Sequence, residues 1–243
     1  MAAQPEFISG AVAPMACLKE GWEAIKDRYW LFLGLTLVAM LIGGAVPVVL
    51  VGPMMCGLYL CLLAKMRNQP VEFGMLFKGF DYFMPGLVAA AIQTLPVILI
   101  VAIGQVIFAA FTMFVLPTQR GDSMPPVFWI GLIIFVLFIS IVSLVVHSLF
   151  VFAYPLIVDR KLSGLDAIKL SYRAAIQNLS GIIGLILLIC GLSILGLIAC
   201  YVGFFLVMPV SFAAYAAAYR RVFPRTDSFS FSTPPPPPGS WAA

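Results

Sequence analysis

Residues 51–65, VGPMMCGLYLCLLAK, decide the fold because they are apolar but too few to cross a bilayer alone. A single crossing helix needs about 20 apolar residues. Gly52-Pro53 lies near the start of the stretch, and a helix tolerates proline in its first turn, where a missing N–H costs least. The stretch also ends a longer run without Asp, Glu, Lys or Arg, residues 29–64. We therefore predict that it is the return limb of a helical hairpin.

The whole chain has the composition of a lipid-embedded protein. Hydrophobic residues make up 63% and charged residues 10% of its 243 residues, and the mean hydropathy is +1.08. Roughly a quarter of the residues of a soluble domain are charged. Four runs lack Asp, Glu, Lys and Arg, namely residues 29–64, 82–119, 123–158 and 174–219. The sequence therefore predicts an all-α integral membrane protein whose surroundings are the lipid bilayer, with no nucleic acid partner.

The first and last of these runs each suit two short helices. Helices of about 17 residues are roughly 25 Å long, and Gly43-Gly44 and Pro47 separate the two in the first run. The middle runs form one hairpin with long limbs, joined by PTQRGDSMPP at 117–126, whose Pro, Gly and Asp are turn residues. Limbs of this length predict tilt, a kink at Pro96 or a part that projects beyond the bilayer. Six transmembrane helices in three hairpins follow, at residues 30–46, 48–64, 84–116, 127–158, 181–200 and 203–219.

Charge placement predicts the orientation of these helices, because Lys and Arg accumulate in short cytoplasmic loops. With the N-terminus inside, 13 of the 14 Lys and Arg residues fall on the cytoplasmic side, and only Arg120 falls outside. We therefore expect both termini to be cytoplasmic. The membrane domain covers residues 17–224, between a flexible N-terminus at 1–16 and a disordered proline-rich tail at 225–243.

An amphipathic segment precedes each hairpin. Apolar residues recur at helical spacing in all three segments, and Ser163 and Asp166 form a capping motif that opens the third. This pattern predicts three helices in the cytoplasmic interface, or alternatively the first turns of the spans themselves. The faces are Leu18, Trp22, Ile25 and Tyr29; then Phe73, Leu76, Phe80 and Phe83; then Leu165, Ile168, Tyr172, Ala175 and Leu179.

The order of these elements carries a resemblance. The stretches GLDAIKLSYRAAIQNLSG (164–181) and CYVGFFLVMPVSFAAYAAAYRRVF (200–223) show this order. It consists of an amphipathic segment, a span, a tight outer turn, and a second span that contains proline and ends in a basic pair. This order resembles a group of uncharacterised bacterial inner-membrane proteins. That group is similar to the membrane domain fused ahead of some bacterial glycerophosphodiester phosphodiesterases. Over residues 15–224, the resemblance implies a six-helix fold in the bacterial cytoplasmic membrane, but no activity.

Polar side chains inside the predicted spans are few, and most of the candidates lie on the central hairpin. His147, the single histidine, shares a helical face with Ser140, Ser143 and Tyr154. Counting depth along the antiparallel limbs places Gln93 level with His147, and Gln105 level with Ser140. We predict that each pair forms a hydrogen bond across the hairpin, with His147 neutral. The candidate intramembrane polar cluster is Gln93, Gln105, Ser140, Ser143, His147 and Tyr154.

No residue pattern indicates catalysis, a metal or a cofactor. The cysteines form no C-x-x-C pair, and a metal site needs more ligands than one histidine and scattered thiols provide. Asp81, Asp159 and Asp166 have no companion histidine or second acid at a spacing that suggests general acid–base work, so we expect them to cap helices and to form surface pairs. The sequence thus predicts a chain that is not an enzyme, with no cofactor.

Small residues and the C-terminal tail point to packing and to partners. Ala213, Ala214, Ala216, Ala217 and Ala218, together with Gly57 and Cys61, form faces that let helices approach closely. Such faces indicate packing within one chain or a homo-oligomer interface. The five consecutive prolines of the tail form a stiff polyproline rod, suited to a partner with an aromatic groove or to no partner at all.

Three functions fit this sequence to different degrees. The favoured hypothesis is a non-enzymatic membrane protein that organises lipids or partner proteins through its basic cytoplasmic face. The alternative is a channel or facilitator for a small or amphipathic solute, which predicts a cavity that connects both sides of the membrane and is lined by Gln93, Gln105 and His147. A dry, closed bundle would favour the first hypothesis. A lipid-modifying enzyme fits least, because no paired acid or base is predicted at the interface.

Overall fold

The computed structural model describes residues 7–115, 126–198 and 202–224, and every regular element in these ranges is a helix. The α-helical, membrane-compatible class predicted from composition is therefore confirmed for this part of the chain. The elements, with two 3₁₀ segments marked η, are α1 Pro14–Ile25, η1 Lys26–Arg28, α2 Tyr29–Ala45, α3 Val51–Met66, η2 Phe73–Tyr82, α4 Phe83–Val115, α5 Pro126–Phe150, α6 Ala153–Arg160, α7 Gly164–Gln177, α8 Leu179–Ile198 and α9 Val202–Val222.

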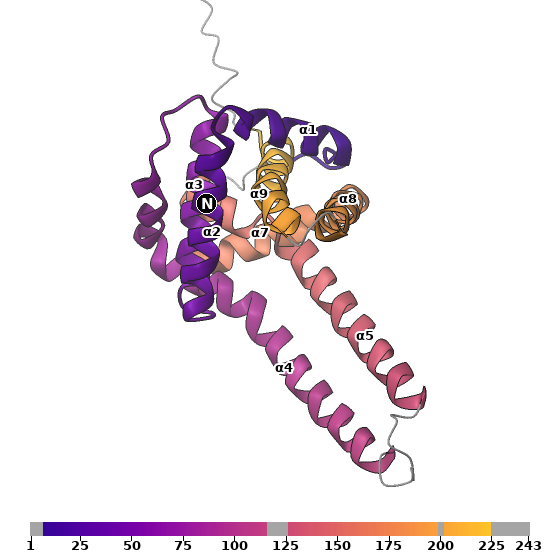
Figure 1. Cartoon of the computed structure of the whole chain (residues 1–243). Helices are drawn as coiled ribbons and strands as arrows, with labels where there is room; N and C mark the ends of the chain where they lie inside the picture. The colour runs from indigo at the N-terminus through magenta and orange to yellow at the C-terminus, as the bar shows by residue number, and fades with distance from the viewer. Residues whose placement is uncertain (1–6, 116–125, 199–201, 225–243) are drawn as a thin grey trace, which may run out of the picture.

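Within the described ranges, five helical stretches are long and apolar enough to cross a membrane. They are Pro14–Ala45, Phe73–Met113, Pro126–Arg160, Leu179–Ile198 and Val202–Val222. The sixth predicted span, 48–64, corresponds to α3, a shorter apolar helix of 16 residues. The axes of the long helices are strongly inclined to one another: α8 points toward the viewer in Figure 1, whereas α4 and α5 run across the view.

Helix α3 lies at the centre of the fold. Eleven of its residues are buried, and it packs against α2, η2, α4 and α6. Pro53 occupies its first turn, as the sequence predicted, because a proline there removes no hydrogen bond within the helix. The helix is thus enclosed by other helices over most of its surface.

Glycines set the distance between α3 and its neighbours. A Cβ on Gly57 would stand 1.9 Å from the carbonyl oxygen of Leu76, and one on Gly79 would stand 2.5 Å from the Gly57 nitrogen. The same kind of approach joins α1 to α9, where a Cβ on Gly21 would lie 2.6 Å from the Ala214 nitrogen. The small-residue faces predicted around Gly57 and Ala214 therefore serve packing within this chain.

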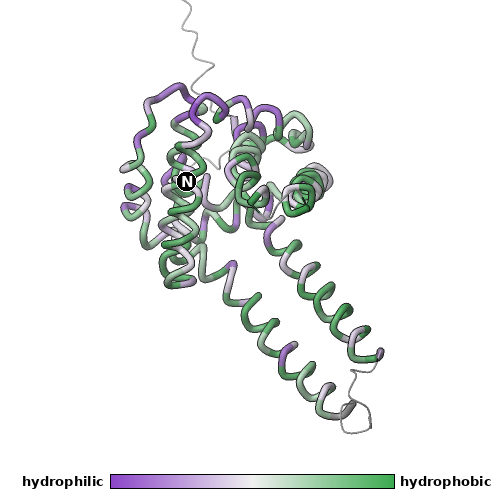
Figure 2. The backbone as a smooth tube through the Cα atoms, in the orientation of Figure 1, coloured by the Kyte–Doolittle hydropathy of each residue, from purple (hydrophilic) through white to green (hydrophobic). Residues whose placement is uncertain are grey.

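Helices α4 and α5 leave this bundle as a long paired arm (Figure 1). Phenylalanines join them: the rings of Phe108 and Phe135 stack with centroids 5.3 Å apart, and a Cβ on Gly104 would lie 2.7 Å from the Phe135 ring. Most side chains of the arm are apolar and exposed, and Figure 2 shows it mainly in the hydrophobic colour. The surface of the arm therefore suits contact with lipid.

The predicted helix at 127–158 is interrupted. Helix α5 ends at Phe150 and α6 begins at Ala153, because Pro155 has no N–H to offer the carbonyl of Val151 and its ring crowds that carbonyl. The Ser171 hydroxyl of α7 supports the break: it accepts from the Phe152 N–H at 3.2 Å and donates to the Leu149 carbonyl at 3.0 Å. The chain is thereby turned into the bundle, where every residue of 151–158 is buried.

The amphipathic segments α1, η2 and α7 are present, and Ser163 caps α7 as predicted by accepting from the Asp166 N–H at 3.2 Å. In each segment, some apolar side chains are buried against the bundle and others are exposed. In α1, Ile25 is buried, whereas Trp22 is 45% exposed. The buried side packs on the bundle, and the outward aromatic side is suited to an interface with lipid.

The N-terminal segment 1–16, whose flexibility stays a prediction, contacts the bundle over its described part. Residues 1–6 and the tail 225–243 lie outside the described residues, but the segment before α1 is held by specific contacts. Ile8 donates its N–H to the Val222 carbonyl at 2.8 Å, and the Asn178 side chain accepts from Ala11 and donates to Ile8. Asn178 is buried, and these bonds complete the pairing of its amide, which also donates to the Ala174 carbonyl at 2.9 Å.

Candidate functional site

Five helices meet around a cavity of about 130 Å³, which we call the Gln93 pocket. Polar side chains reach it from four of them: Tyr59 from α3, Gln93 and Thr94 from α4, His147 from α5 and Tyr154 from α6. Apolar side chains complete the walls, including Phe212 from α9. Three members of the predicted polar cluster, Gln93, His147 and Tyr154, are therefore brought together.

The break between α5 and α6 is one reason why these side chains converge. Where α4 and α5 approach the bundle, His147 lies on the last turn of α5 and Tyr154 on the first turn of α6. The Pro155 interruption redirects the chain between these two residues while both still line the pocket. The rings of His147 and Tyr215 of α9 meet edge to face, with centroids 5.3 Å apart, which anchors α5 to α9.

The predicted hydrogen bond between Gln93 and His147 is not formed, although both residues line the pocket. Gln93 Oε1 is buried without a hydrogen-bond partner. Thr94, beside it, is satisfied locally because its hydroxyl donates to the Ala90 carbonyl at 2.6 Å. Depth counting therefore predicted which residues share a site, but the space between them is open rather than bridged.

The other three members of the predicted cluster lie outside the pocket. Gln105 and Ser140 are exposed on the arm, and Ser143 is half-buried. The predicted bond between Gln105 and Ser140 is absent, because the Ser140 hydroxyl donates to the Val136 carbonyl at 2.8 Å. A serine in an apolar helix can satisfy its hydroxyl on the preceding turn. Ser140 therefore needs no partner on α4, although it lies at the same predicted depth as Gln105.

A second polar region, which the sequence did not reveal as a unit, joins the ends of four helices. We call it the charged end: Lys19, Glu20, Lys26, Asp27, Arg28, Lys65, Arg67, Asp159, Arg160, Tyr219, Arg220 and Arg221. At its centre, Asp159 pairs with Arg67 and accepts a hydrogen bond from the Tyr219 hydroxyl at 2.9 Å. The Asp159 side chain is only 5% exposed. This carboxylate therefore belongs to a buried tie between α3, α6 and α9, rather than to the surface pairing expected of it.

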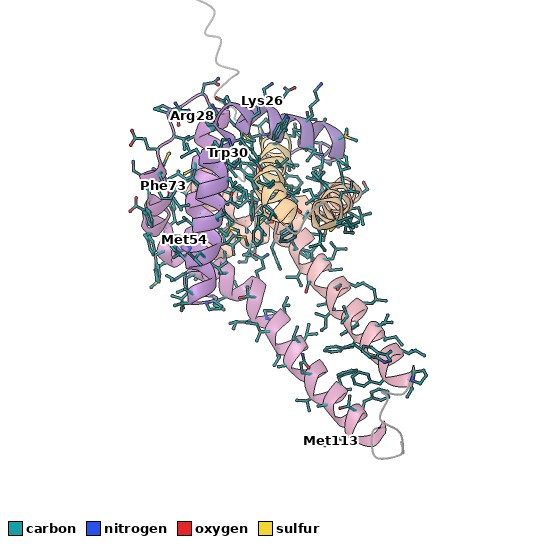
Figure 3. The ribbon with its side chains drawn as sticks, in the orientation of Figure 1. Lys26, Arg28, Trp30, Met54, Phe73 and Met113 are labelled. Carbon is teal, nitrogen blue, oxygen red and sulfur yellow. The ribbon has the colours of Figure 1, made fainter. Side chains whose placement is uncertain are left out.

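Further ion pairs attach α1 and η1 to the same end. Arg221 donates to Glu20 at 3.1 Å, and Arg220 donates to the Met66 carbonyl at 3.1 Å. Lys65 pairs with Asp27 of η1, and their hydrogen bond, the largest of several causes, lowers the pKa of the Asp27 carboxyl. Figure 3 places Lys26 and Arg28 close together, with Met113 at the far end of the arm. The ion pairs and hydrogen bonds of the charged end thus lie far from the apolar end of the arm.

The cysteines and acids of the described ranges form no group of three or more His, Cys, Asp or Glu residues that could hold a metal ion. Cys17, Cys56 and Cys61 are buried as free thiols, and Cys190 is exposed. Cys200 lies outside the described residues. Asp166, as expected, acts in capping, since it accepts from the Ser163 hydroxyl at 2.7 Å.

Comparison with known proteins yields no relative for this chain: no family model, no curated protein and no solved structure matches it.

Proposed function

We propose that this chain is a non-enzymatic, multi-pass membrane protein that gathers anionic lipids around its charged end and so organises the membrane next to it. One observation carries the proposal: α1 and η1 expose Lys19 and Lys26 beside the half-exposed indole of Trp22. Within the described residues these two lysines form no ion pair. Basic side chains next to an aromatic side chain are typical of helices that lie on anionic membrane surfaces.

The rest of the charged end supports this use of α1. Glu20 is engaged by Arg221 and Asp27 by Lys65, so two of the three carboxylates of α1 and η1 are occupied by other cations, and the third, Glu23, is exposed. The neighbouring Trp30 is 76% exposed, and tryptophan is enriched at the level of lipid headgroups. Lys19 and Lys26 are therefore available for phosphate groups at that level.

The proposed topology has six helices in three hairpins, with both termini on the cytoplasmic side of a bacterial inner membrane. Ion pairs join the C-terminal end of α3 to η1 and to the C-terminal end of α6, and the C-terminal end of α9 to α1, as expected if these ends share one side of the bilayer. The resemblance to the membrane domain of glycerophosphodiester phosphodiesterases supports the same arrangement. We further propose that the proline-rich tail contacts a protein partner on that side.

Cysteine labelling in intact cells tests this topology. On a thiol-free background, a cysteine at position 169 should react only from the cytoplasm, and one at position 123 only from outside. Reaction of both positions from the same side contradicts the hairpin that joins α4 and α5.

Native mass spectrometry of the full chain, released from nanodiscs of mixed phosphatidylglycerol and phosphatidylcholine, tests the lipid function. The Lys19→Gln/Lys26→Gln variant should retain anionic lipid on the order of tenfold less well, since each lysine near such a surface contributes about 1 kcal/mol. The matched control, Lys161→Gln/Lys169→Gln, removes the same charge from exposed positions outside the charged end and should lower retention less. Equal retention by both variants contradicts the proposal.

A further inference from the structure

The Gln93 pocket contains hydrogen-bonding groups that the protein itself leaves unused. Gln93 Oε1 is buried without a partner. A buried amide oxygen normally has a hydrogen bond, because burial removes it from water and an unpaired one is costly. The side chain lines the cavity, and rotation of its amide exchanges the positions of oxygen and nitrogen. The amide can therefore present either a donor or an acceptor to an occupant.

Other groups around the cavity add to this capacity. In the described part of the chain, no hydrogen bond involves the hydroxyls of Tyr59 and Tyr154, both of which line the pocket. Among the same described residues, the His147 ring meets Tyr215 edge to face and forms no hydrogen bond. A neutral imidazole carries one donor and one acceptor, and each tyrosine hydroxyl can act as both. Side chains that carry an amide, an imidazole and two hydroxyls thus line one space.

The walls of the pocket select against charge. Its lining residues include no Asp, Glu, Lys or Arg. An ion placed there would lose its hydration without gaining a counter-charge. The remaining walls are apolar, among them Val51, Met55 and Phe150, so a small apolar part of a ligand would be accommodated. A volume of about 130 Å³ is several times the share of one water molecule in the liquid, roughly 30 Å³.

From these observations we propose that the Gln93 pocket binds an uncharged, hydroxyl-bearing group, held by Gln93 and His147. The hydroxyl donates to the Gln93 carbonyl oxygen and accepts from the His147 ring N–H, which satisfies the buried amide. Such a group can come from two sources, the hydroxyl head of a neutral amphiphile in the bilayer or a small diol from water. This site is separate from the charged end, so the two proposals can fail independently.

The single histidine of the chain makes the pocket directly observable. The full protein, purified without a histidine tag and labelled with ¹⁵N,¹³C-histidine, gives imidazole signals from His147 alone. In nanodiscs, 1-dodecanol represents the bilayer source, propane-1,3-diol represents the aqueous source, and dodecane is the control without a hydroxyl. We expect a saturable shift of the ring nitrogen signals with dodecanol or with the diol, and none with dodecane.

The responses to the three probes either support the proposal and identify the source of the ligand, or overturn it. A shift with dodecanol alone assigns the bilayer source, and a shift with the diol alone assigns the aqueous source. No shift with either hydroxyl probe, leaving only water in the pocket, overturns the proposal. An equal shift with dodecane also overturns it, because apolar filling would then explain the effect.

Variants identify the residue that holds the hydroxyl. In Gln93→Leu, the probe concentration that gives the half-maximal shift should rise at least tenfold. Gln105 is an exposed glutamine on the same helix, and Gln105→Leu should leave this concentration unchanged. If Gln93→Leu does not fold, Gln93→Met keeps a side chain of similar length without the amide, and it should weaken binding in the same way. Binding that survives unchanged in Gln93→Leu or Gln93→Met overturns the role of Gln93.

Discussion

The centre of the bundle and the outer arm use the same residue types, glycine and large apolar side chains, in opposite ways. Around α3, glycine brings backbone against backbone, as where Gly57 meets the Leu76 carbonyl. Along the arm, glycine instead receives an aromatic ring, as where Gly104 meets Phe135. A backbone cannot withdraw without moving a whole helix, whereas a ring can turn. The bundle is therefore expected to be rigid and sensitive to mutation, and the arm to be tolerant.

The largest expected effect compares one substitution in the two regions. Gly57→Ala places a methyl group within 1.9 Å of a carbonyl oxygen, so it should destabilise the fold by about 3 kcal/mol or more, the upper range for overpacking. Gly104→Ala meets only the end of the Phe135 ring and should cost about 1 kcal/mol. Unfolding in mixed micelles, followed by circular dichroism, measures both changes.

Gly191→Ala is the control for this pair, because a Cβ at position 191 meets nothing within 4 Å. It should change stability by no more than about 0.5 kcal/mol. If Gly57→Ala were as mild as this control, the close crossing of α3 and η2 would be wrong. A Gly104→Ala variant as damaging as Gly57→Ala would show that the arm is as rigid as the bundle.

A second, intermediate effect concerns the charged end, which has no counterpart on the described part of the arm. Asp159→Asn removes the charge that pairs with Arg67 and weakens the bond from Tyr219. We expect a loss of about 2 kcal/mol, less than for a fully buried pair because the Arg67 side chain is 28% exposed. Asp81→Asn, at an exposed position, should be nearly neutral in the same unfolding assay. Equal effects at the two positions would contradict a buried tie at Asp159.

The contrast between the two regions also explains what the sequence could predict. Helix positions followed from charge-free runs and local signals, such as Pro53 in the first turn of α3 and Ser163 as the cap of α7. These signals act over a few residues. Depth counting also placed Gln93 and His147 at one pocket, because two antiparallel helices of known rise constrain which residues lie level.

Other features escaped prediction because they depend on distant or uniform sequence. Arg67 and Asp159 are 92 positions apart, and no local pattern connects them. The arm is apolar on all sides, so its sequence carries no periodic contrast to show that Gly104 faces Phe135. The end of α5 was predictable in principle, since Pro155 stands inside an otherwise helical run. It was missed because the apolar run continues past it.

The smallest expected effect lies at the exposed edge of the charged end, where Lys65 pairs with Asp27 of η1. The hydrogen bond from Lys65 is the largest cause of the lowered pKa of Asp27, so Lys65→Met should return that pKa toward its ordinary value. A lowered carboxyl pKa stabilises the fold at pH values above the ordinary pKa, and this contribution disappears as the pH falls through the lowered pKa. Because the Asp27 side chain is 55% exposed, solvent screens the pair and unfolding at neutral pH should hardly change. A ¹³C titration of the aspartate carboxyls, with Asp27→Asn to assign the signal, measures the pKa directly. If the pKa of Asp27 stays low in Lys65→Met, the backbone of η1, rather than the ion pair, keeps that pKa low. This part of the charged end would then resemble the arm, because local structure alone would stabilise it.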